Sequence, residues 1–343
     1  MFENLKSNIV LFMCIYNETE VKDMALELKP LGKSGLQVTP AGFGVLTVGP
    51  WQMNLPVDEG AAVLRYALEA GINFMDTAQY YKTYPYIRQA LKGFSGDPVI
   101  ASKSLDASYE EMDFAIEECR QALDRDVIDI FLLHEVREDP DWEHRAGAWA
   151  CLQDAKAKGR IKAVGISTHH IDAAERAAVT PELDILFPLI NFSGLGIRKG
   201  SGKGPREEME AAIAKAHQAG KGVFAMKVFG GGNLTPHFRE ALDYASGLPG
   251  LDSMMIGFGY KYEIDQILDY LEGKLPEDYT PSLSHKKITI DQGDCEGCGS
   301  CVKRCPNHAI FLNSRGLAEV DHSRCITCGY CAPACPVMAI VMY

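Results

Sequence analysis

The stretch Ile128-Asp129-Ile130-Phe131-Leu132-Leu133-His134 is a short apolar run that ends on an ionisable side chain. Such a run is typical of a strand buried inside a domain. From Leu28 onward the chain alternates runs of this kind with helical patterns, which predicts parallel strands joined by crossover helices. The expected strands are Ala41–Thr47, Asn73–Thr77, Val99–Ser102, Ile128–Leu133, Ala163–Ser167, Ile185–Ile190, Val223–Met226 and Ser253–Ile256.

Between these runs, apolar residues recur at i, i+3 or i+4, and i+7, which is the spacing of one helical face. Three such faces are Met112, Ala115, Ile116, Cys119; Met209, Ala212, Ile213, Ala216; and Ile264, Ile267, Leu268, Leu271. Eight strand–helix units in roughly 230 residues predict an α/β fold of the closed (β/α)8 type, a TIM barrel with its catalytic groups at the C-terminal strand ends. An open doubly wound sheet is the alternative, although no G-x-G-x-x-G follows the first strand.

The segments outside the barrel are also recognisable. Residues 28–38 are expected to form a hairpin that closes the barrel floor. We expect an N-terminal extension at 1–24, the barrel at 25–272, a proline-containing linker at 273–286 and a small α+β module at 287–343. Whether translation starts at Met1 or Met24 stays open.

Composition limits the classes of function. Of the 343 residues, 47% are hydrophobic, as in a folded globular protein, and the net charge of -12 argues against a nucleic-acid surface. No apolar run approaches the roughly 18–20 residues that span a bilayer. We therefore expect a soluble, cytoplasmic protein with neither nucleic acid nor a membrane as partner.

Eight of the eleven cysteines form two copies of the spacing C-x2-C-x2-C-x3-C-P near the end of the chain. A two-cluster bacterial ferredoxin has this spacing, and in it three thiolates of each run hold one [4Fe-4S] cluster while the fourth crosses to the other. One cluster is expected to take Cys295, Cys298, Cys301 and Cys335, and the other Cys325, Cys328, Cys331 and Cys305.

Two alternatives fit the cysteines less well. A zinc ribbon usually lacks the third evenly spaced cysteine and the closing Cys-Pro. A disulfide framework would suit a small secreted domain, and the chain has no recognisable secretion signal. The remaining thiols, Cys14, Cys119 and Cys151, are predicted to be ordinary cysteines.

Ionisable side chains fall where a barrel places its active site. Asp76 ends the second expected strand, Tyr81 follows it, and Lys103 and His134 end the third and fourth. The segments that hold them resemble the catalytic tetrad of the aldo-keto reductases, and residues 158–167 are similar to that family's fifth-strand segment. The resemblance covers about residues 25–272, and with the C-terminal cysteines it points to the iron-sulfur-containing branch of the family.

The resemblance implies reduction of an aldehyde or ketone, and elementary chemistry suggests the roles. A phenol with a pKa near 10 is a slow proton donor at pH 7, and a neighbouring ammonium group lowers that pKa. We expect Tyr81 to donate the proton, Lys103 to lower the pKa of Tyr81, Asp76 to hold Lys103, and His134 to orient the carbonyl. The alternative is a structural Asp76–Lys103 ion pair beside an ordinary tyrosine and histidine.

The resemblance also implies a cofactor, NADP or NAD. Ser167 and Thr168 would lie near the nicotinamide carboxamide, and Lys227, Gly230 and Gly231 would approach the pyrophosphate. The chain departs from the family at three positions. These are Thr168 where asparagine is common, Phe187 near the usual glutamine, and Met226 where an aromatic residue usually stacks.

Two loops bear on the cofactor and on anionic ligands. Residues 257–263 are expected to meet the adenosine end and offer no arginine for a 2'-phosphate, so the preference between NADH and NADPH stays open. The basic, glycine-rich residues 198–206 either contact an acidic substrate or cofactor phosphate, or form a solvated loop.

Three functions remain open at this point. The first is a nicotinamide-dependent carbonyl reductase whose clusters serve electron transfer or partner docking. The second is a ferredoxin-coupled oxidoreductase in which the clusters supply the electrons, and the third is a non-catalytic redox-sensing or assembly subunit. The expected partners are a small carbonyl substrate and a redox protein that binds the ferredoxin-like module.

Overall fold

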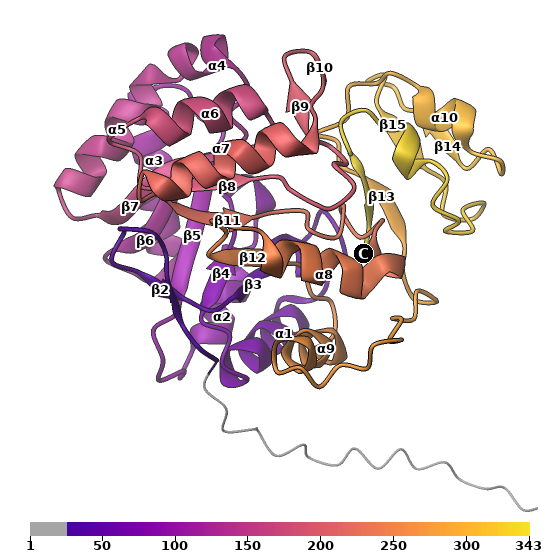
Figure 1. Cartoon of the computed structure of the whole chain (residues 1–343), viewed down its shortest axis with the longest axis horizontal. Coiled ribbons are helices and arrows are strands. Elements are labelled where there is room, and N and C mark those ends of the chain that lie inside the picture. Colours follow the sequence, from indigo (N-terminus) through magenta and orange to yellow (C-terminus); the bar gives the residue numbers. More distant parts are fainter. Residues whose placement is uncertain (1–25) are drawn as a thin grey trace, which may run out of the picture.

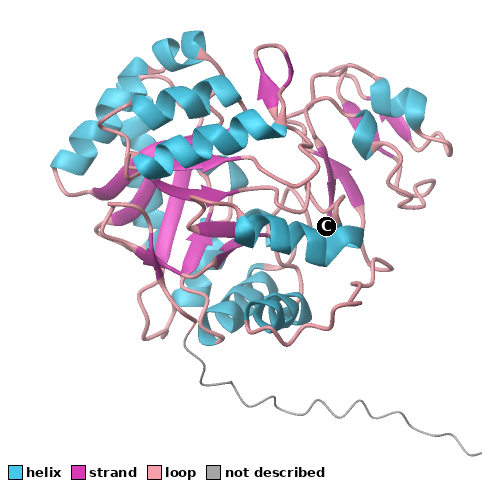
Figure 2. Ribbon diagram, in the orientation of Figure 1, coloured by secondary structure: helices cyan, strands magenta, loops and turns pink. Residues whose placement is uncertain are grey.

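The computed structural model describes residues 26–343, in which eight parallel strands form a closed barrel inside a ring of helices (Figures 1 and 2). The expected extension at 1–24, with Cys14 and Met24, lies outside the described residues. The barrel strands are β3 (Ala41–Gly44), β4 (Phe74–Asp76), β5 (Val99–Ser104), β6 (Ile128–Leu133), β7 (Ile161–Thr168), β8 (Ile185–Pro188), β11 (Gly222–Ala225) and β12 (Ser253–Ile256). Their order around the barrel follows the sequence, and β12 closes on β3. The predicted eight-stranded barrel is confirmed.

The helices around the barrel carry the predicted apolar faces. Every residue of the three expected faces is buried or packs against the core, and Cys119 and Cys151 are buried thiols. Three strands are shorter than expected. In β3 the strand ends at Gly44, where a 3-10 turn, η1 (Val45–Val48), follows it, while β4 spans only Phe74–Asp76 and β8 ends at Pro188. The helices are α1 (Val57–Glu69), α2 (Tyr84–Leu91), α3 (Tyr109–Leu123), α4 (Asp139–His144), α5 (Ala146–Ala157), α6 (Ile171–Val179), α7 (Arg206–Gln218), α8 (Phe238–Gly247) and α9 (Lys261–Leu271).

A hairpin of β1 (Lys29–Pro30) and β2 (Gln37–Val38) closes the barrel floor, as expected. Leu31 and Val38 are fully buried and belong to the same apolar cluster as the interior side chains of the barrel. Gly32 has a φ of +53°, and a Cβ there would lie 2.2 Å from the amide nitrogen of Gly222. Only glycine fits this turn, because it lets the hairpin approach the start of β11 so closely.

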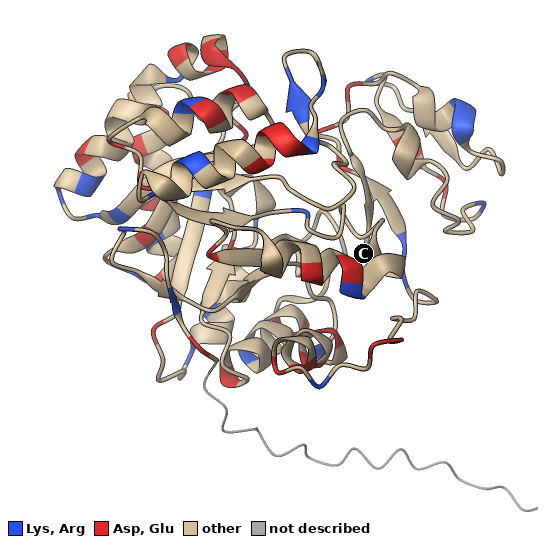
Figure 3. Ribbon diagram, in the orientation of Figure 1, with Lys and Arg blue, Asp and Glu red and all other residues tan. Residues whose placement is uncertain are grey.

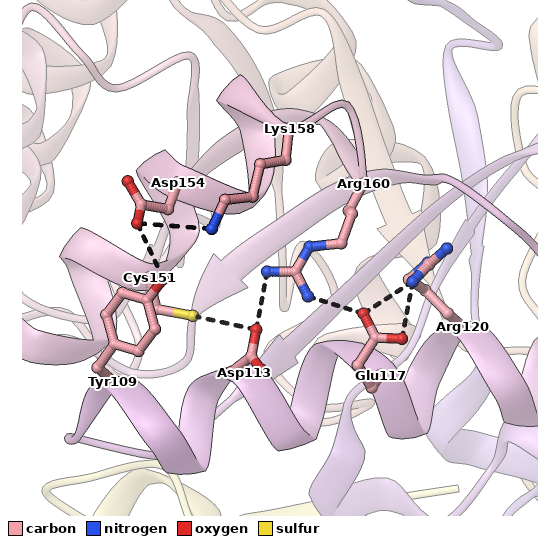
Figure 4. A network of polar contacts seen from close by, with 8 residues as sticks. All are labelled: Tyr109, Asp113, Glu117, Arg120, Cys151, Asp154, Lys158 and Arg160. Carbon is pink, nitrogen blue, oxygen red and sulfur yellow. Dashed lines mark hydrogen bonds and ion pairs between the residues drawn. The ribbon is translucent and has the colours of Figure 1, made fainter.

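The outer helices are joined by a polar network (Figure 4). The guanidinium of Arg160 donates to Asp113 and Glu117, each at 2.7 Å, and the Tyr109 hydroxyl donates to Asp154 at 2.9 Å. These contacts tie α3 to α5 and to the residue that precedes β7. Because Arg160 stands before its strand, the network lies toward the N-terminal strand ends, which in such barrels serve stability.

The C-terminal module lies beside the barrel (Figure 1). It contains β13 (Ile288–Ile290) paired with β16 (Ile340–Met342), β14 (Ile310–Leu312) paired with β15 (Ala318–Val320), the short helix α10 (Ser300–Arg304) and the turn η4 (Ala332–Ala334). Its apolar core is separate from that of the barrel and includes Cys301 and Cys331, with Cys295, Cys305, Cys325 and Cys335 packed against it. Within residues 26–343, no helix is long and apolar enough to cross a membrane.

Candidate active site

The four predicted catalytic residues meet at the C-terminal ends of neighbouring strands. Asp76 is the last residue of β4, Lys103 lies near the end of β5, and His134 directly follows β6. Tyr81 is the last residue of the 3-10 turn η2 (Gln79–Tyr81), which begins three residues after β4. Parallel neighbours end at one rim, so residues far apart in sequence come together there.

Asp76 and Lys103 form a buried ion pair. The Lys103 ammonium lies 2.7 and 2.8 Å from the two carboxylate oxygens and donates to the Thr77 carbonyl at 2.6 Å. Burial raises the pKa of Asp76 and lowers that of Lys103, while the attraction between them opposes both shifts. All three ammonium protons are used, which fixes Lys103 in position.

Tyr81 and His134 face each other above this pair. The Tyr81 hydroxyl lies 3.3 Å from Nε2 of His134, and the rings meet edge to face. Burial first, then the charges of Lys103 and Arg145, hold the pKa of His134 well below its ordinary value, so the imidazole is neutral. Nδ1 of His134 is buried without a hydrogen-bond partner among the described residues.

The pKa of Tyr81 differs from the expectation. Burial raises it well above 10, and the carboxylates of Asp76, Glu135, Asp291 and Asp294 raise it further. Lys103 lies 4.8 Å from the centre of the phenol ring, but its charge is balanced by Asp76. The predicted lowering of the Tyr81 pKa is therefore wrong for this arrangement, in which the phenol stays protonated.

Arg145 supports the site, and the sequence analysis missed it. Its buried guanidinium donates to the carbonyl of His134 at 2.7 Å and to the carbonyl of Ser104 at 2.8 Å. These are the strand ends that carry His134 and Lys103. No local motif marks this arginine, because its partners are backbone groups distant in sequence.

A cavity of about 200 Å³ opens above these residues between the barrel and the C-terminal module. The barrel contributes Asp76, Tyr81, Phe187, Met226 and Lys227 to its lining. The module contributes Asp291, Val341, Met342 and Tyr343. The two domains thus share the walls of the candidate active site.

The hydroxyls predicted near a nicotinamide carboxamide are already paired within the barrel. Ser167 accepts a hydrogen bond from the Glu135 amide at 2.9 Å. Thr168 donates to the Val136 carbonyl at 2.6 Å and accepts from the His170 amide at 2.8 Å. Both residues are fully buried and neither lines the cavity.

The residues predicted near a pyrophosphate contact the C-terminal module. The Lys227 ammonium donates to Asp294 at 2.8 Å, and the Gly231 carbonyl accepts from the Met342 amide at 2.7 Å. A Cβ on Gly232, whose φ is +84°, would lie 2.0 Å from the Met342 carbonyl oxygen. Gly232 therefore allows β16 to approach the loop after β11.

Three carboxylates surround Lys227. Burial alone would lower the pKa of Lys227, but Asp294, Asp291 and Glu135 raise it. Burial and the charge of Asp294 raise the pKa of Glu135 to about 8. Glu135 has a φ of +55°, an uncommon backbone conformation that was not foreseen from the sequence.

The loops at 257–263 and 198–206 also contact neighbouring segments. Glu263, in the loop expected at the adenosine end, caps α9 and forms an ion pair with Lys286. The basic residues 198–206 form a hairpin of β9 (Arg198–Lys199) and β10 (Gly202–Lys203). Its Arg198 lies 3.3 Å from Glu296 of the module.

The cysteines of the module are arranged in two crossed sets. One cavity is lined by Cys305, Cys325, Cys328 and Cys331, the set expected around one cluster. Burial, followed by the neighbouring thiol of Cys335 and more weakly that of Cys295, raises the pKa of Cys301 to about 11, so these three residues of the other set lie close together. The arrangement fits two clusters in which each run lends its fourth cysteine to the other.

Backbone amides point at the sulfur atoms. The Ala309 amide lies 3.2 Å from Sγ of Cys305, and the Ala339 amide lies 3.3 Å from Sγ of Cys335. The two contacts occur at the same spacing after each Cys-Pro pair. Such amides stabilise negative charge on thiolates and influence the potential of an iron-sulfur cluster.

Comparison with known families matches both parts of the chain. The sequence model of the Aldo/keto reductase family matches residues 41–272, and that of the 4Fe-4S dicluster domain matches residues 288–342. The first match includes Asp76, Tyr81, Lys103 and His134. The second contains all eight cysteines of the two runs.

Curated relatives are similar over part of the barrel. L-galactose dehydrogenase from Arabidopsis thaliana is 29% identical over 159 residues, which cover 43% of this chain and 50% of the relative. Methylglyoxal reductase DkgA from Escherichia coli is 28% identical over 192 residues, 53% of this chain and 67% of the relative. The chain spans about half the length of the first of these curated relatives.

A solved structure shares the fold. An aldo-keto reductase from Bombyx mori, in complex with NADP, superposes with a TM-score of 0.56 at 17% identity. The superposition covers 76% of this chain and 90% of the Bombyx mori chain. At this identity the likeness shows the barrel fold alone.

Proposed function

Because the chain belongs to the aldo/keto reductase family and carries a 4Fe-4S dicluster domain, we propose that it reduces an aldehyde or ketone reversibly at the barrel mouth. The single observation that carries this proposal is the cluster of Tyr81, His134, Lys103 and Asp76, of which Tyr81 and Asp76 line the cavity. These groups supply a proton donor, an orienting imidazole and a fixed positive charge beside the phenol.

The substrate carbonyl oxygen accepts hydrogen bonds from Tyr81 and from Nε2 of His134 in this proposal. As the oxygen gains charge it takes the Tyr81 proton, because an alkoxide is a stronger base than a phenolate. The raised pKa of Tyr81 keeps the phenol protonated until that moment. Lys103, 4.8 Å from the ring centre, offsets part of the cost of the negative charge left behind, although Asp76 balances its own charge.

We propose NADPH or NADH as the cofactor, which when bound supplies a hydride to the carbonyl carbon. The Bombyx mori structure, which shares the barrel fold, is a complex with NADP and supports this choice. Ser167, Thr168, Lys227, Gly230 and Gly231 remain the proposed contacts. Lys227 has to leave Asp294 before it can meet a phosphate.

One observation favours the second candidate, in which the clusters supply the electrons. Asp294 and β16 of the module contact the residues that would bind the pyrophosphate, and Lys286 contacts Glu263 at the expected adenosine end. In this arrangement the module, together with Lys286 at the end of the linker, contacts residues that are predicted to bind the dinucleotide. Reduction would then draw two single electrons and two protons for each carbonyl.

Carbonyl turnover by anaerobically reconstituted protein separates these candidates. Tyr81→Phe should lower turnover by about 10²–10⁴-fold, whereas the matched control Tyr80→Phe should keep it, because Tyr80 stacks on Trp51 and has no contact with His134. Full turnover in Tyr81→Phe would overturn the proposed proton donor.

Titration with NADH and NADPH tests the electron source independently. Nucleotide-driven turnover that survives Cys295→Ser supports the first candidate. Bleaching of the cluster absorbance by nucleotide links the nicotinamide to the iron. If neither nucleotide binds and a reduced carrier protein supports turnover, the second candidate holds.

A further inference from the structure

The charges of the C-terminal module are divided between two sides. Three of its acids face the barrel, since Asp294 pairs with Lys227, Glu296 pairs with Arg198, and Asp291 lines the shared cavity. Lys303 and Arg304, at the end of α10, and Arg324 are exposed. The basic end of α10 is blue in Figure 3. Within residues 26–343, none of these three side chains forms an ion pair, although Arg324 lies close enough to Asp321 to help lower its pKa after hydrogen bonds from Ser323.

Exposed apolar side chains lie among these basic residues. Ile326 is 67% exposed and Tyr330 is 59% exposed, and both stand between cysteines of the second run. The guanidinium of Arg304 lies 6.0 Å from the centre of the Tyr330 ring. Asn307 donates to the Arg324 carbonyl at 3.4 Å, which brings the end of the first run beside the second. We call this surface the distal face, made of Lys303, Arg304, Arg324, Ile326, Cys328 and Tyr330.

The distal face belongs to the set of cysteines farther from the barrel. Val337 and Met338 follow Cys335, and they contact the barrel, where Val337 lines a cavity with His169 and Met338 packs on Gly196. Cys335 belongs to the set that includes Cys295 and Cys301, so that set lies beside the barrel. The other set includes Cys328, which is itself exposed on the distal face.

We propose that the distal face is the docking surface for a small one-electron carrier protein with an acidic surface. An apolar centre with a charged rim is typical of a protein interface, and small electron-transfer interfaces are at the weak, transient end. The basic rim stands on a chain whose net charge is -12, so an acidic carrier is repelled elsewhere and steered to this face.

This proposal rests on the second candidate function, because it names where the electrons enter. Each encounter oxidises one carrier by one electron. Reduction of one carbonyl to an alcohol therefore needs two encounters and two protons. The same face also serves the reverse direction, in which the module passes electrons to an oxidised carrier.

The test is the rate of cluster reduction in the full, anaerobically reconstituted chain without any carbonyl substrate. The probe is a small acidic [2Fe-2S] ferredoxin, reduced beforehand, and the readout is bleaching of the module's absorbance in a stopped-flow instrument. Arg304→Glu and Arg324→Glu should each lower the second-order rate constant by about tenfold at low salt. Added salt should slow the wild type more than either variant.

The matched control is Arg315→Glu, which changes the same charge in the same module. Arg315 is exposed but lies toward the barrel, since its charge acts on Tyr80 and its guanidinium donates to Gln292 at 2.9 Å. The second-order rate constant for cluster reduction in Arg315→Glu should equal that of the wild type. Reduction by dithionite should be equal in all four proteins and shows that the clusters are intact.

Two outcomes would overturn the proposal. In the first, reduced ferredoxin reduces the clusters of the wild type and of both distal-face variants at the same rate. In the second, Arg315→Glu lowers this rate as much as the distal-face variants do. Neither outcome depends on carbonyl turnover. Failure of the docking surface is therefore distinguishable from failure of the proposed reductase activity.

Discussion

Lys103 and Lys227 are both paired with an aspartate, but Lys103 is buried, Lys227 is partly exposed, and the two lie in different electrostatic surroundings. Lys103 is 1% exposed and has a single carboxylate partner, Asp76, within its own domain. Lys227 is 21% exposed, and its partner Asp294 comes from the other domain, with Asp291 and Glu135 close by. The pKa of Lys103 is lowered, mainly by burial, whereas that of Lys227 is raised.

The difference shows what each pair does. The carboxylates of Asp76 and, more weakly, Glu135 do not outweigh the burial of Lys103, so that pair is a local unit built from residues of the barrel alone. Three carboxylates do outweigh the burial of Lys227, and two of them arrive only when the module docks. The pKa of Lys227 therefore depends on domain docking, whereas the pKa of Lys103 depends on the barrel alone.

Among changes to the two ion pairs, Lys103→Met is expected to lower the free energy of unfolding most. Removing the ammonium leaves Asp76 buried without a counter-charge, and breaking such a pair costs about 3–5 kcal/mol. Denaturant unfolding of the holoprotein measures the loss. The double variant Lys103→Met with Asp76→Asn should regain most of this stability without regaining turnover. A loss below about 1 kcal/mol in the single variant would show that Asp76 accepts a proton instead.

A smaller effect is expected from Lys227→Met, which removes the charge that holds Asp294. A hydrogen bond to a charged group is worth about 1.5–3 kcal/mol, and here it joins two domains. We expect faster protease cleavage in the linker at 273–286, with the barrel still folded. Lys103→Met is the matched control. Its linker should be cleaved faster only to the extent that more of the protein is globally unfolded. Equal cleavage in wild type and Lys227→Met would show that the pair does not hold the module.

The smallest expected effect is the pH dependence of stability that Glu135 causes. The folded-state pKa of Glu135 is about 8, against about 4.3 in an unfolded chain. Between these values the folded state binds a proton that the unfolded state has lost, so stability falls as the pH rises from about 4.3 to about 8 and stays level above that. Glu135→Gln mimics the protonated acid and should raise Tm by about 2 °C at pH 9 with no gain at pH 5. A gain of the same size at both pH values would contradict this assignment.

The barrel and the cysteine sets could be predicted because their signals are local. Apolar runs mark the strands, strand ends place Asp76, Lys103 and His134, and cysteine spacing fixes the two sets. The surroundings of Lys227 could not be predicted, because Asp294 is 67 residues away and reaches it only through docking. The direction of the Tyr81 pKa was predicted wrongly because burial raises it most, and because Asp291 and Asp294, which raise it further, reach Tyr81 only through docking. Arg145 escaped notice because it binds carbonyl groups, which every sequence has.

Gly232 is a position at which any side chain would block the contact between the two domains. Its missing side chain is the space that the Met342 carbonyl occupies, and its backbone conformation also disfavours any other residue. One added methyl group would act as a wedge that separates the two halves without altering any charge. A related barrel with a larger residue at this place must hold its own module, if it has one, in a different pose.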